Sequence, residues 1–429
     1  MSTFSRGAVG VVLGAVVVVG AGLPLIPGQS TAARRTGLAT TFTVDSTADA
    51  DDAKIGDGVC AAVGGGCTLR AAIREANAFP GTVTINLPAG TYALTIAGKG
   101  EENGATGDLD IQGTITIVGA GSSSTIVDGG GLDRVFDVAA SGDATISGVT
   151  IRNGSADVGG GVRNSGTLTL QRVTVTANTA TNQGGGLFNT STGTLTIADS
   201  IVSANTATNY GGGVGNDAGG TLTVLRSLVT ANTAQQGAGG VGTAGTAGLT
   251  NATIVANTVT QGSVFTNGDG GGVLVIGAGK LTLLNDTITG NTATRGAGVV
   301  AESGTTATAK NTIIASNAFE KNCGGTITSQ GHNLDSSTNC GFDQAGDMKS
   351  TNPLLGSLAE NVGPTPTEAP LPGSPVIDAG DNNGCPPTDA RGAPRPFDGK
   401  GTGNKVCDIG AVEYGATTKL WLAVVARNG

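Results

Sequence analysis

The stretch ANTAT fills residues 177–181 and returns unchanged at residues 204–208. Close variants follow as ANTAQ from residue 231, ANTVT from residue 256 and GNTAT from residue 290. A final variant, SNAFE, begins at residue 316. The Asn residues of the whole series stand 27, 27, 25, 34 and 26 residues apart. A period of this length is typical of stacked supersecondary units. The series comprises Asn178, Asn205, Asn232, Asn257, Asn291 and Asn317.

Each repeat unit holds three short segments with the character of β-strands. In the unit that begins at residue 184 they cover 186–189, 194–198 and 200–204. They are rich in Thr, Val, Ile and Leu and alternate apolar with polar residues. None is long enough for a helix. Three strands per turn of chain, stacked turn on turn about 4.8 Å apart, predict an all-β parallel β-helix.

Apolar residues recur at fixed places in the repeat, so we expect them to point inward and stack. A one-residue slip would turn every side chain to the wrong face. One column lies three residues before each Asn and comprises Val175, Val202, Val229, Ile254, Ile288 and Ile314. A second column, in the middle strand of the unit, comprises Leu168, Leu195, Leu222, Leu249 and Leu281.

The Asn residues and a recurring Gly cluster are expected at the corners between strands. Asn tolerates the left-handed backbone of a sharp corner, and stacked Asn amides can bond along a column. The Gly residues would occupy the other corner, where a side chain would clash or a positive φ is needed. The alternative is an Asn row that binds a ligand.

A further column, six residues before each Asn, carries charge. Two interpretations stay open: an exposed ladder of salt bridges, which contributes little stability, or a charged groove for a sugar chain. The column comprises Arg172, Asp199, Arg226, Asn251, Asn285 and Asn311.

The composition narrows the class of protein. The net charge is −9 and there are no basic runs, which argues against nucleic acid and anionic membranes as partners. Residues 1–32 resemble a signal peptide, because Arg6 precedes a long uncharged run and a small-residue cleavage site; an uncleaved anchor is the alternative. We therefore expect a secreted or cell-surface protein without a membrane span in the mature chain.

The six cysteines fit such a location, because disulfides persist outside the cytoplasm. Six cysteines allow 15 pairings. The simplest prediction joins near neighbours, as Cys60–Cys67, Cys323–Cys340 and Cys385–Cys407.

A short amphipathic helix is predicted before the repeats, with Thr68 as its N-cap and an apolar stripe of Leu69, Ala72, Ile73 and Ala76. With a strand over 82–86 it would close the N-terminal end of the stack. The sequence here, CTLRAAIREAN, resembles the CSLREA domain of secreted bacterial β-helix proteins. Thr68 replaces the family's Ser and Ala71 replaces its Glu.

Two further resemblances cover the rest of the chain. The repeats are similar to those of polymorphic outer-membrane proteins, although GGGLFN and VSAN keep the spacing without the usual Phe. The C-terminal part resembles the choice-of-anchor Q domain, with Glu368 where that family often has His. Its matching residues are 353–355, 374–380, 389, 391–392, 395–396 and 407–413.

Together the resemblances imply an exported right-handed parallel β-helix of the pectin-lyase-like type, and no known reaction. They divide the chain into a signal peptide (1–32), an N-terminal cap (33–80), the β-helix (81–340), a C-terminal cap (341–415) and a tail (416–429). Mixed charges in the C-terminal cap are expected to form an ion-pair network that closes the C-terminal end, with a functional site as the alternative.

Candidate sites are few. Between Gly113 and Gly325 no acidic cluster recurs on adjacent predicted rungs, and the densest charged group is Asp128, Asp133, Arg134 and Asp137. The single histidine, His332, is expected to be structural. Asp49, Asp51 and Asp57 can supply oxygen ligands to Ca²⁺, or they form a solvated acidic loop.

We therefore expect no catalytic residue and no cofactor other than this Ca²⁺. The function favoured by the sequence is a non-catalytic, glycan-binding or adhesive surface protein. The alternatives are a polysaccharide lyase or glycoside hydrolase, which convergent carboxylates from adjacent rungs would favour, and a passive spacer. The 34-residue repeat, with its insertion TQGSVFTNGDG, is where specificity is expected.

Overall fold

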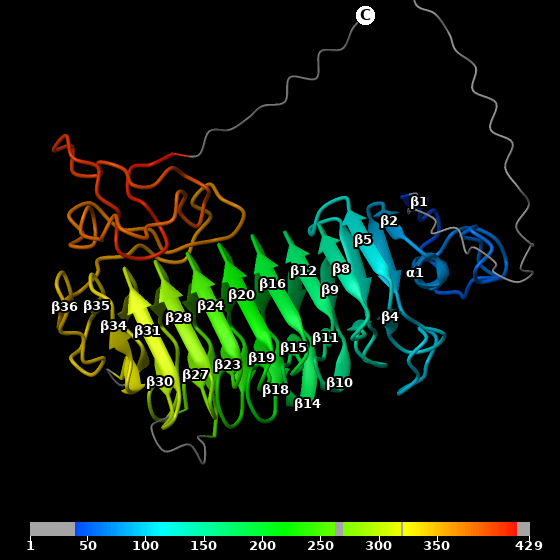
Figure 1. Cartoon of the computed structure of the whole chain (residues 1–429), viewed down its shortest axis with the longest axis horizontal. Coiled ribbons are helices and arrows are strands. Elements are labelled where there is room, and N and C mark those ends of the chain that lie inside the picture. Colours follow the sequence, from blue (N-terminus) through cyan, green and yellow to red (C-terminus); the bar gives the residue numbers. More distant parts are fainter. Residues whose placement is uncertain (1–38, 262–268, 319–320, 418–429) are drawn as a thin grey trace, which may run out of the picture. The chain divides into compact units, whose positions relative to one another are not determined.

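The structure is a computed structural model that describes residues 39–261, 269–318 and 321–417. Its described part is a right-handed parallel β-helix, as predicted (Figure 1). The signal peptide, most of the insertion in the 34-residue repeat and the tail from residue 418 lie outside the described residues. The only helix that the described residues form is too short to cross a membrane.

Three long sheets run along the stack, and each complete turn of chain, from β2 to β33, adds one parallel strand to each. The first sheet contains β1 (Thr40–Thr43), β2 (Thr82–Leu87), β5 (Thr114–Gly119), β8 (Asp143–Ser147), β12 (Thr167–Gln171), β16 (Thr194–Ala198), β20 (Thr221–Leu225), β24 (Thr246–Thr250), β28 (Lys280–Leu284), β31 (Thr306–Lys310) and β34 (Thr328–Ser329).

The second sheet follows the first along each turn. It contains β3 (Gly90–Ala93), β6 (Thr125–Asp128), β9 (Thr150–Arg152), β13 (Thr174–Thr176), β17 (Ile201–Ser203), β21 (Leu228–Thr230), β25 (Thr253–Val255), β29 (Thr287–Thr289), β32 (Ile313–Ala315), β35 (Leu334–Asp335) and β36 (Met348–Lys349).

The third sheet completes the turn. It contains β4 (Leu109–Ile111), β7 (Phe136–Val138), β11 (Val162–Asn164), β15 (Leu187–Asn189), β19 (Val214–Asn216), β23 (Val241–Thr243), β27 (Val273–Val275), β30 (Val299–Ala301) and β33 (Cys323–Gly325). Five turns add a fourth, short sheet that the sequence did not predict: β10 (Ser155–Val158), β14 (Thr179–Gln183), β18 (Thr206–Ala207), β22 (Thr233–Ala234) and β26 (Thr258–Val259).

The register of the second sheet places the predicted column from Val175 to Ile314 in one buried line. The Leu column is correct except at Leu249. That residue pairs with Val224 and Leu283, whereas Ala247 pairs with Leu222 and Leu281. The 25-residue repeat before this strand shifts the sequence by two positions, and Leu249 stays buried because the shift is even.

The six Asn side chains are buried and form a continuous ladder. In each step the Nδ2 of one Asn donates to the Oδ1 of the next, at 2.9 to 3.0 Å, and the last step runs from Asn317 to Asn322 at 3.1 Å. A second ladder joins Asn164, Asn189 and Asn216 at one end of the third sheet.

The expected role of the ladder Asn backbone was wrong. The left-handed corner residue is the one before it, as at Ala177 (φ 55°) and Ala204 (φ 54°). The Asn must aim its amide inward, so the preceding residue takes the turn and exposes a small side chain. At the Gly corner a Cβ on Gly185 would lie 2.4 Å from the carbonyl oxygen of Gly212 on the next turn.

Both ends of the stack are covered. The helix α1 (Leu69–Ala78) has Thr68 as its N-cap and buries the predicted apolar stripe. The three disulfides join the near neighbours as predicted. At the other end, Phe342 is buried against the core beside the Cys323–Cys340 disulfide.

The remaining C-terminal segment, residues 351–417, was misplaced by the sequence prediction. It lies along the side of the last turns (Figure 1) and not on the open end. The guanidinium of Arg395 donates to Asn251 at 2.9 Å, and Asn285 donates to the carbonyl oxygen of Asp408 at 3.0 Å. The expected ion-pair network is present within the segment, with Arg395 and Glu413 2.7 Å apart.

Candidate functional site

Acidic side chains meet on the outer face of the third sheet, at its N-terminal turns. Asp110 on β4 pairs in register with Asp137 on β7, which pairs with Arg163 on β11. Adjacent strands lie about 4.8 Å apart, so the three side chains form one line. The prediction that no acidic cluster recurs on adjacent rungs covered residues 113–325, so it did not include Asp110, which lies in the irregular first turns.

A loop of residues 94–108 covers this line of side chains, and the N-terminal cap holds the loop in place. The buried guanidinium of Arg70 donates to the carbonyl oxygens of Gly104, Gly107 and Asp108 at 2.8 to 3.1 Å. Asp49 binds Arg70 at 2.6 Å and accepts from two backbone N–H groups of the same loop. Arg70, the first arginine of the CTLRAAIREAN stretch, thus holds the loop that covers the acidic side chains.

Two arginines bridge the carboxylates. Arg134 lies 2.9 Å from Asp108 and 3.1 Å from Asp137, while Arg163 lies 2.5 Å from Asp137 and 3.3 Å from Glu102. Asp110 differs from these carboxylates. It accepts the backbone N–H of Gly104 at 2.5 Å, and no Lys or Arg of the described residues forms an ion pair with it.

The cluster has more acid than base. Four of its carboxylates are buried, those of Asp108, Asp110, Asp133 and Asp137, and Glu102 adds an exposed fifth against two guanidinium groups. Burial, with the neighbouring charge of Asp108, raises the pKa of Asp110 to about 8. Burial also raises the pKa of Asp108 to about 7. At neutral pH Asp110 therefore holds a proton and can donate a hydrogen bond.

Unsatisfied polar atoms concentrate here. Among the described residues five buried side-chain polar atoms have no hydrogen-bond partner, and three of them are Asp137 Oδ1, Arg134 Nε and Arg163 Nε. Native proteins have few such atoms, so their concentration in one place marks a functional candidate. One carboxylate oxygen from each of Glu102, Asp110 and Asp137 lies within 4.8 Å of the other two, a spacing that can hold a metal ion.

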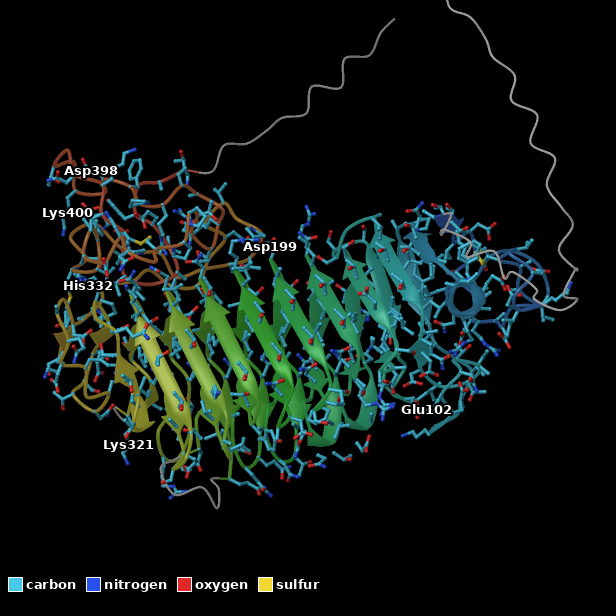
Figure 2. All side chains as sticks on the ribbon, viewed as in Figure 1. Glu102, Asp199, Lys321, His332, Asp398 and Lys400 are labelled. Atoms are coloured by element: carbon cyan, nitrogen blue, oxygen red, sulfur yellow. A yellow bond between two sulfur atoms is a disulfide. The ribbon has the colours of Figure 1, made fainter. Side chains whose placement is uncertain are left out.

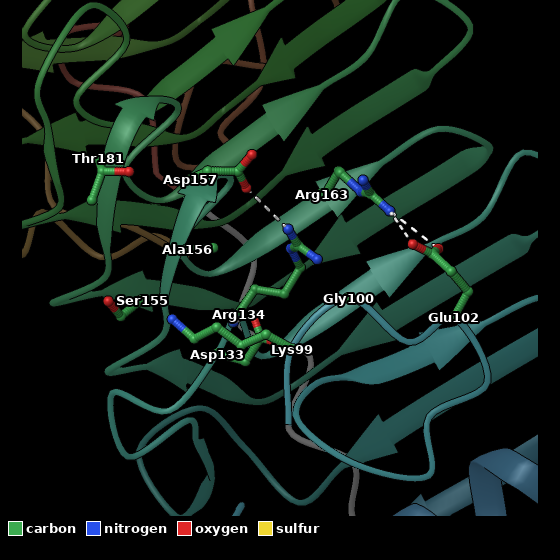
Figure 3. A pocket seen from close by; sticks show the side chains of 10 residues that line it. All are labelled: Lys99, Gly100, Glu102, Asp133, Arg134, Ser155, Ala156, Asp157, Arg163 and Thr181. Carbon is green, nitrogen blue, oxygen red and sulfur yellow. Dashed lines mark hydrogen bonds and ion pairs between the residues drawn. The ribbon is translucent and has the colours of Figure 1, made fainter. Parts of the chain in front are cut away.

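A pocket of about 430 Å³ opens beside the cluster (Figure 3). Arg134 and Arg163 form part of its wall and contact the carboxylates of Asp108 and Asp137, which do not line it. Lys99 extends across it toward Ser155 and forms no ion pair within the described residues (Figure 3). We call this the charged pocket; its polar lining includes Lys99, Glu102, Arg134, Ser155, Asp157 and Arg163.

The structure divides the predicted charged group. Asp133, Arg134 and Asp137 belong to the cluster, but Asp128 instead binds Arg152 at 2.7 Å. The sequence prediction missed Glu102, Asp108 and Asp110, since they precede the regular repeats. The signal available was GDLDIQ, in which two acids flank a leucine just before a strand.

The predicted Ca²⁺ ligands do not meet. Asp49 binds Arg70, Asp51 binds Arg74, and Asp57 accepts the N–H of Val59. His332, labelled in Figure 2, places Nδ1 2.8 Å from the carbonyl oxygen of Ala379 in the C-terminal segment, a structural contact.

The charged column from Arg172 to Asn311 lies elsewhere, at the left-handed corner between the first and second sheets. Asp199 and Arg226 form an ion pair at 2.7 Å. Asn251, Asn285 and Asn311 are covered by the C-terminal segment. Arg172 is exposed and forms no ion pair with any described residue, and it borders two shallow pockets of about 540 and 370 Å³.

Comparisons with known proteins assign this chain to no family. No family model matches the chain, so the CSLREA and choice-of-anchor Q resemblances stay predictions. No curated protein matches it either. Among solved structures, a crystal structure of pectate lyase Pel9A is similar, with 16% identity and a TM-score of 0.46, over 87% of this chain and 96% of that one.

Proposed function

We propose that this chain acts outside the cytoplasm and binds an acidic polysaccharide in the charged pocket. The observation that carries the proposal is Lys99, an exposed ammonium without an ion-pair partner among the described residues, which faces hydroxyl and carboxylate groups across the pocket. A uronic acid chain offers a carboxylate for Lys99 and hydroxyl groups for Ser155 and Asp157. The three disulfides support an extracytoplasmic location, since they persist in oxidising compartments.

A second candidate function is cleavage of the bound polymer. The observation that favours it is the pair of carboxylates on adjacent turns, Asp110 and Asp137. Asp110, whose pKa burial raises to about 8, supplies a proton at neutral pH, and Asp137 lies between two guanidinium groups. Acid–base cleavage of a glycosidic bond requires a protonated and an ionised carboxyl at short distance. Burial raises the pKa of Asp137, and the contacts with Arg163 and Arg134 oppose this effect and favour its ionised form. Both are buried, so Arg163 and Glu102 would have to move for a sugar to reach them.

The test uses the full chain, oxidised, with a panel of neutral and acidic polysaccharides. Retained protein and polymer length are followed in the same samples. Binding in the charged pocket predicts that Lys99→Ala lowers retention on acidic polymers about tenfold or more, while Lys280→Ala, an exposed lysine on β28, does not. If Arg172→Ala lowers retention and Lys99→Ala does not, the polymer binds at the shallow pockets beside Arg172 and the proposal fails. Absence of retention on every polymer also refutes it.

Cleavage is tested in the same tubes. Shortening of the polymer that disappears in Asp110→Asn supports the second candidate. Retention with unchanged polymer length refutes the second candidate and leaves binding alone.

A further inference from the structure

We propose that Glu102, Asp110 and Asp137 bind one Ca²⁺ ion, which fastens the loop of residues 94–108 to the third sheet. Glu102 belongs to the loop, while Asp110 and Asp137 belong to β4 and β7. This inference does not depend on polysaccharide binding, because it concerns an ion and a loop of the protein itself.

The spacing of the carboxylates fits the ion. One oxygen from each residue lies within 4.8 Å of the other two. Calcium takes oxygen ligands at about 2.3–2.6 Å, so two ligands of one ion lie at most about 5 Å apart. The three oxygens are therefore close enough together to share one Ca²⁺ ion.

A second observation points independently to a ligand. Asp137 Oδ1 is buried and has no hydrogen-bond partner, in a side chain that is 3% exposed. A buried carboxylate oxygen without a partner is unfavourable, because it has lost its hydrogen bonds to water and gained none from the protein. The carboxyl group of Asp110 accepts one hydrogen bond, from the backbone N–H of Gly104.

The surrounding charges favour a cation. Asp108, Asp133 and Glu101 add negative charge around the three proposed ligands, against the two guanidinium groups of Arg134 and Arg163. The two positive charges of Ca²⁺ would displace the proton of Asp110 and reduce the repulsion among the resulting carboxylates.

Arg163 is the competitor of the ion. Its guanidinium contacts Asp137 at 2.5 Å and Glu102 at 3.3 Å, two of the three proposed ligands. Its side chain is 29% exposed on the side of the charged pocket, so it has room to turn outward when Ca²⁺ binds. Removing Arg163 should therefore strengthen Ca²⁺ binding, whereas a purely structural ion-pair cluster predicts no such gain.

The experiment titrates CaCl₂ into the full, metal-stripped chain by isothermal calorimetry, without any polysaccharide. We expect one Ca²⁺ per chain, at least tenfold weaker binding in Asp110→Asn and Glu102→Gln, and tighter binding in Arg163→Gln. Asp143→Asn, an exposed carboxylate on β8, is the matched control and should bind as the wild type does. Glu102 is exposed, so its variant keeps the test valid if Asp110→Asn does not fold.

Hydrogen exchange of residues 95–107 is measured on the same samples. Ca²⁺ should slow exchange in this loop in the wild type and not in Glu102→Gln. Absence of Ca²⁺ binding at millimolar concentration, or equal affinity in Glu102→Gln and wild type, overturns the inference. Binding that leaves exchange in the loop unchanged also overturns it. None of these outcomes bears on polysaccharide retention, which is assayed separately in metal-free buffer.

Discussion

Replacing one ladder residue, Asn205→Ala, tests how far the stack depends on its buried amides. The Asn205 side chain makes four hydrogen bonds. Its Nδ2 donates to Asn232 Oδ1 at 2.9 Å and to the carbonyl oxygen of Val175 at 3.0 Å, and its Oδ1 accepts the backbone N–H and the Nδ2 of Asn178, each at 3.0 Å. All four are lost in the variant.

The expected loss follows from counting these bonds. At about 1 kcal/mol for each buried hydrogen bond, the variant loses about 4 kcal/mol of unfolding free energy. Two partners keep another bond: Asn178 Nδ2 still reaches the carbonyl oxygen of Ile151, and Asn232 Oδ1 still accepts the N–H of Asn205. The N–H of Asn178 loses the partner that Asn205 supplied, so the loss should not fall below about 2 kcal/mol.

The assay is equilibrium unfolding in urea, followed by far-UV circular dichroism with disulfides intact. Asn404→Ala is the control, because Asn404 is exposed in the C-terminal segment, and it should change stability by less than about 0.5 kcal/mol. A loss in Asn205→Ala as small as in Asn404→Ala would refute the idea that the ladder stabilises the stack. The turns would then be held by their apolar columns alone.

Three further predictions concern other parts of the molecule. Gly185→Ala should lower the unfolding free energy by about 3 kcal/mol or more, or prevent folding, because its Cβ would meet two backbone carbonyl oxygens within 2.5 Å. The control Gly248→Ala should leave stability unchanged, because its Cβ would have no atom within 4 Å. Equal melting temperatures of the two variants would contradict this prediction. Reducing the disulfides should speed hydrogen exchange at residues 60–67 and 323–340 before the middle turns, and uniform loosening would count against this. Burial raises the pKa of Asp110 to about 8, so its protonated form contributes stability that is fully present below about pH 4 and is lost as the pH rises to about 8. In metal-free buffer the unfolding free energy of Asp110→Asn should therefore fall less over this pH range than that of the wild type. Parallel pH profiles of the two proteins would show that Asp110 is ionised throughout.

The fold could be predicted from the sequence because the repeat is close to periodic between Asn178 and Asn317. The buried columns and the Gly corner follow from alternation and from the Asn spacing alone. Leu249 shows the limit of such counting, since one unit of 25 residues moved it by two positions. The left-handed Ala residues show another limit: the residue that takes the strained backbone is set by where the buried amide must point, and composition does not reveal this.

Most of the candidate site could not be predicted, because its residues lie outside the periodic part of the sequence. Asp108 and Asp110 lie before the regular repeats, so no column could be drawn through them in advance. Their neighbours come from three different segments, namely the loop that carries Glu102, the turn that carries Arg134 and the strand that carries Arg163. Only the pairing of β4, β7 and β11 brings these segments together.

The C-terminal segment that lies along the side of the last turns has a consequence for the order in which the chain can fold. Arg395 bonds to Asn251 across 144 positions of sequence, and Asn285 bonds to Asp408 across 123. Turns of a solenoid otherwise contact only their neighbours and can form one after another. Here the amides of Asn251, Asn285 and Asn311 stay open to water until the last part of the chain is synthesised. The final segment therefore completes these contacts last and makes the second half of the β-helix fold as one cooperative unit.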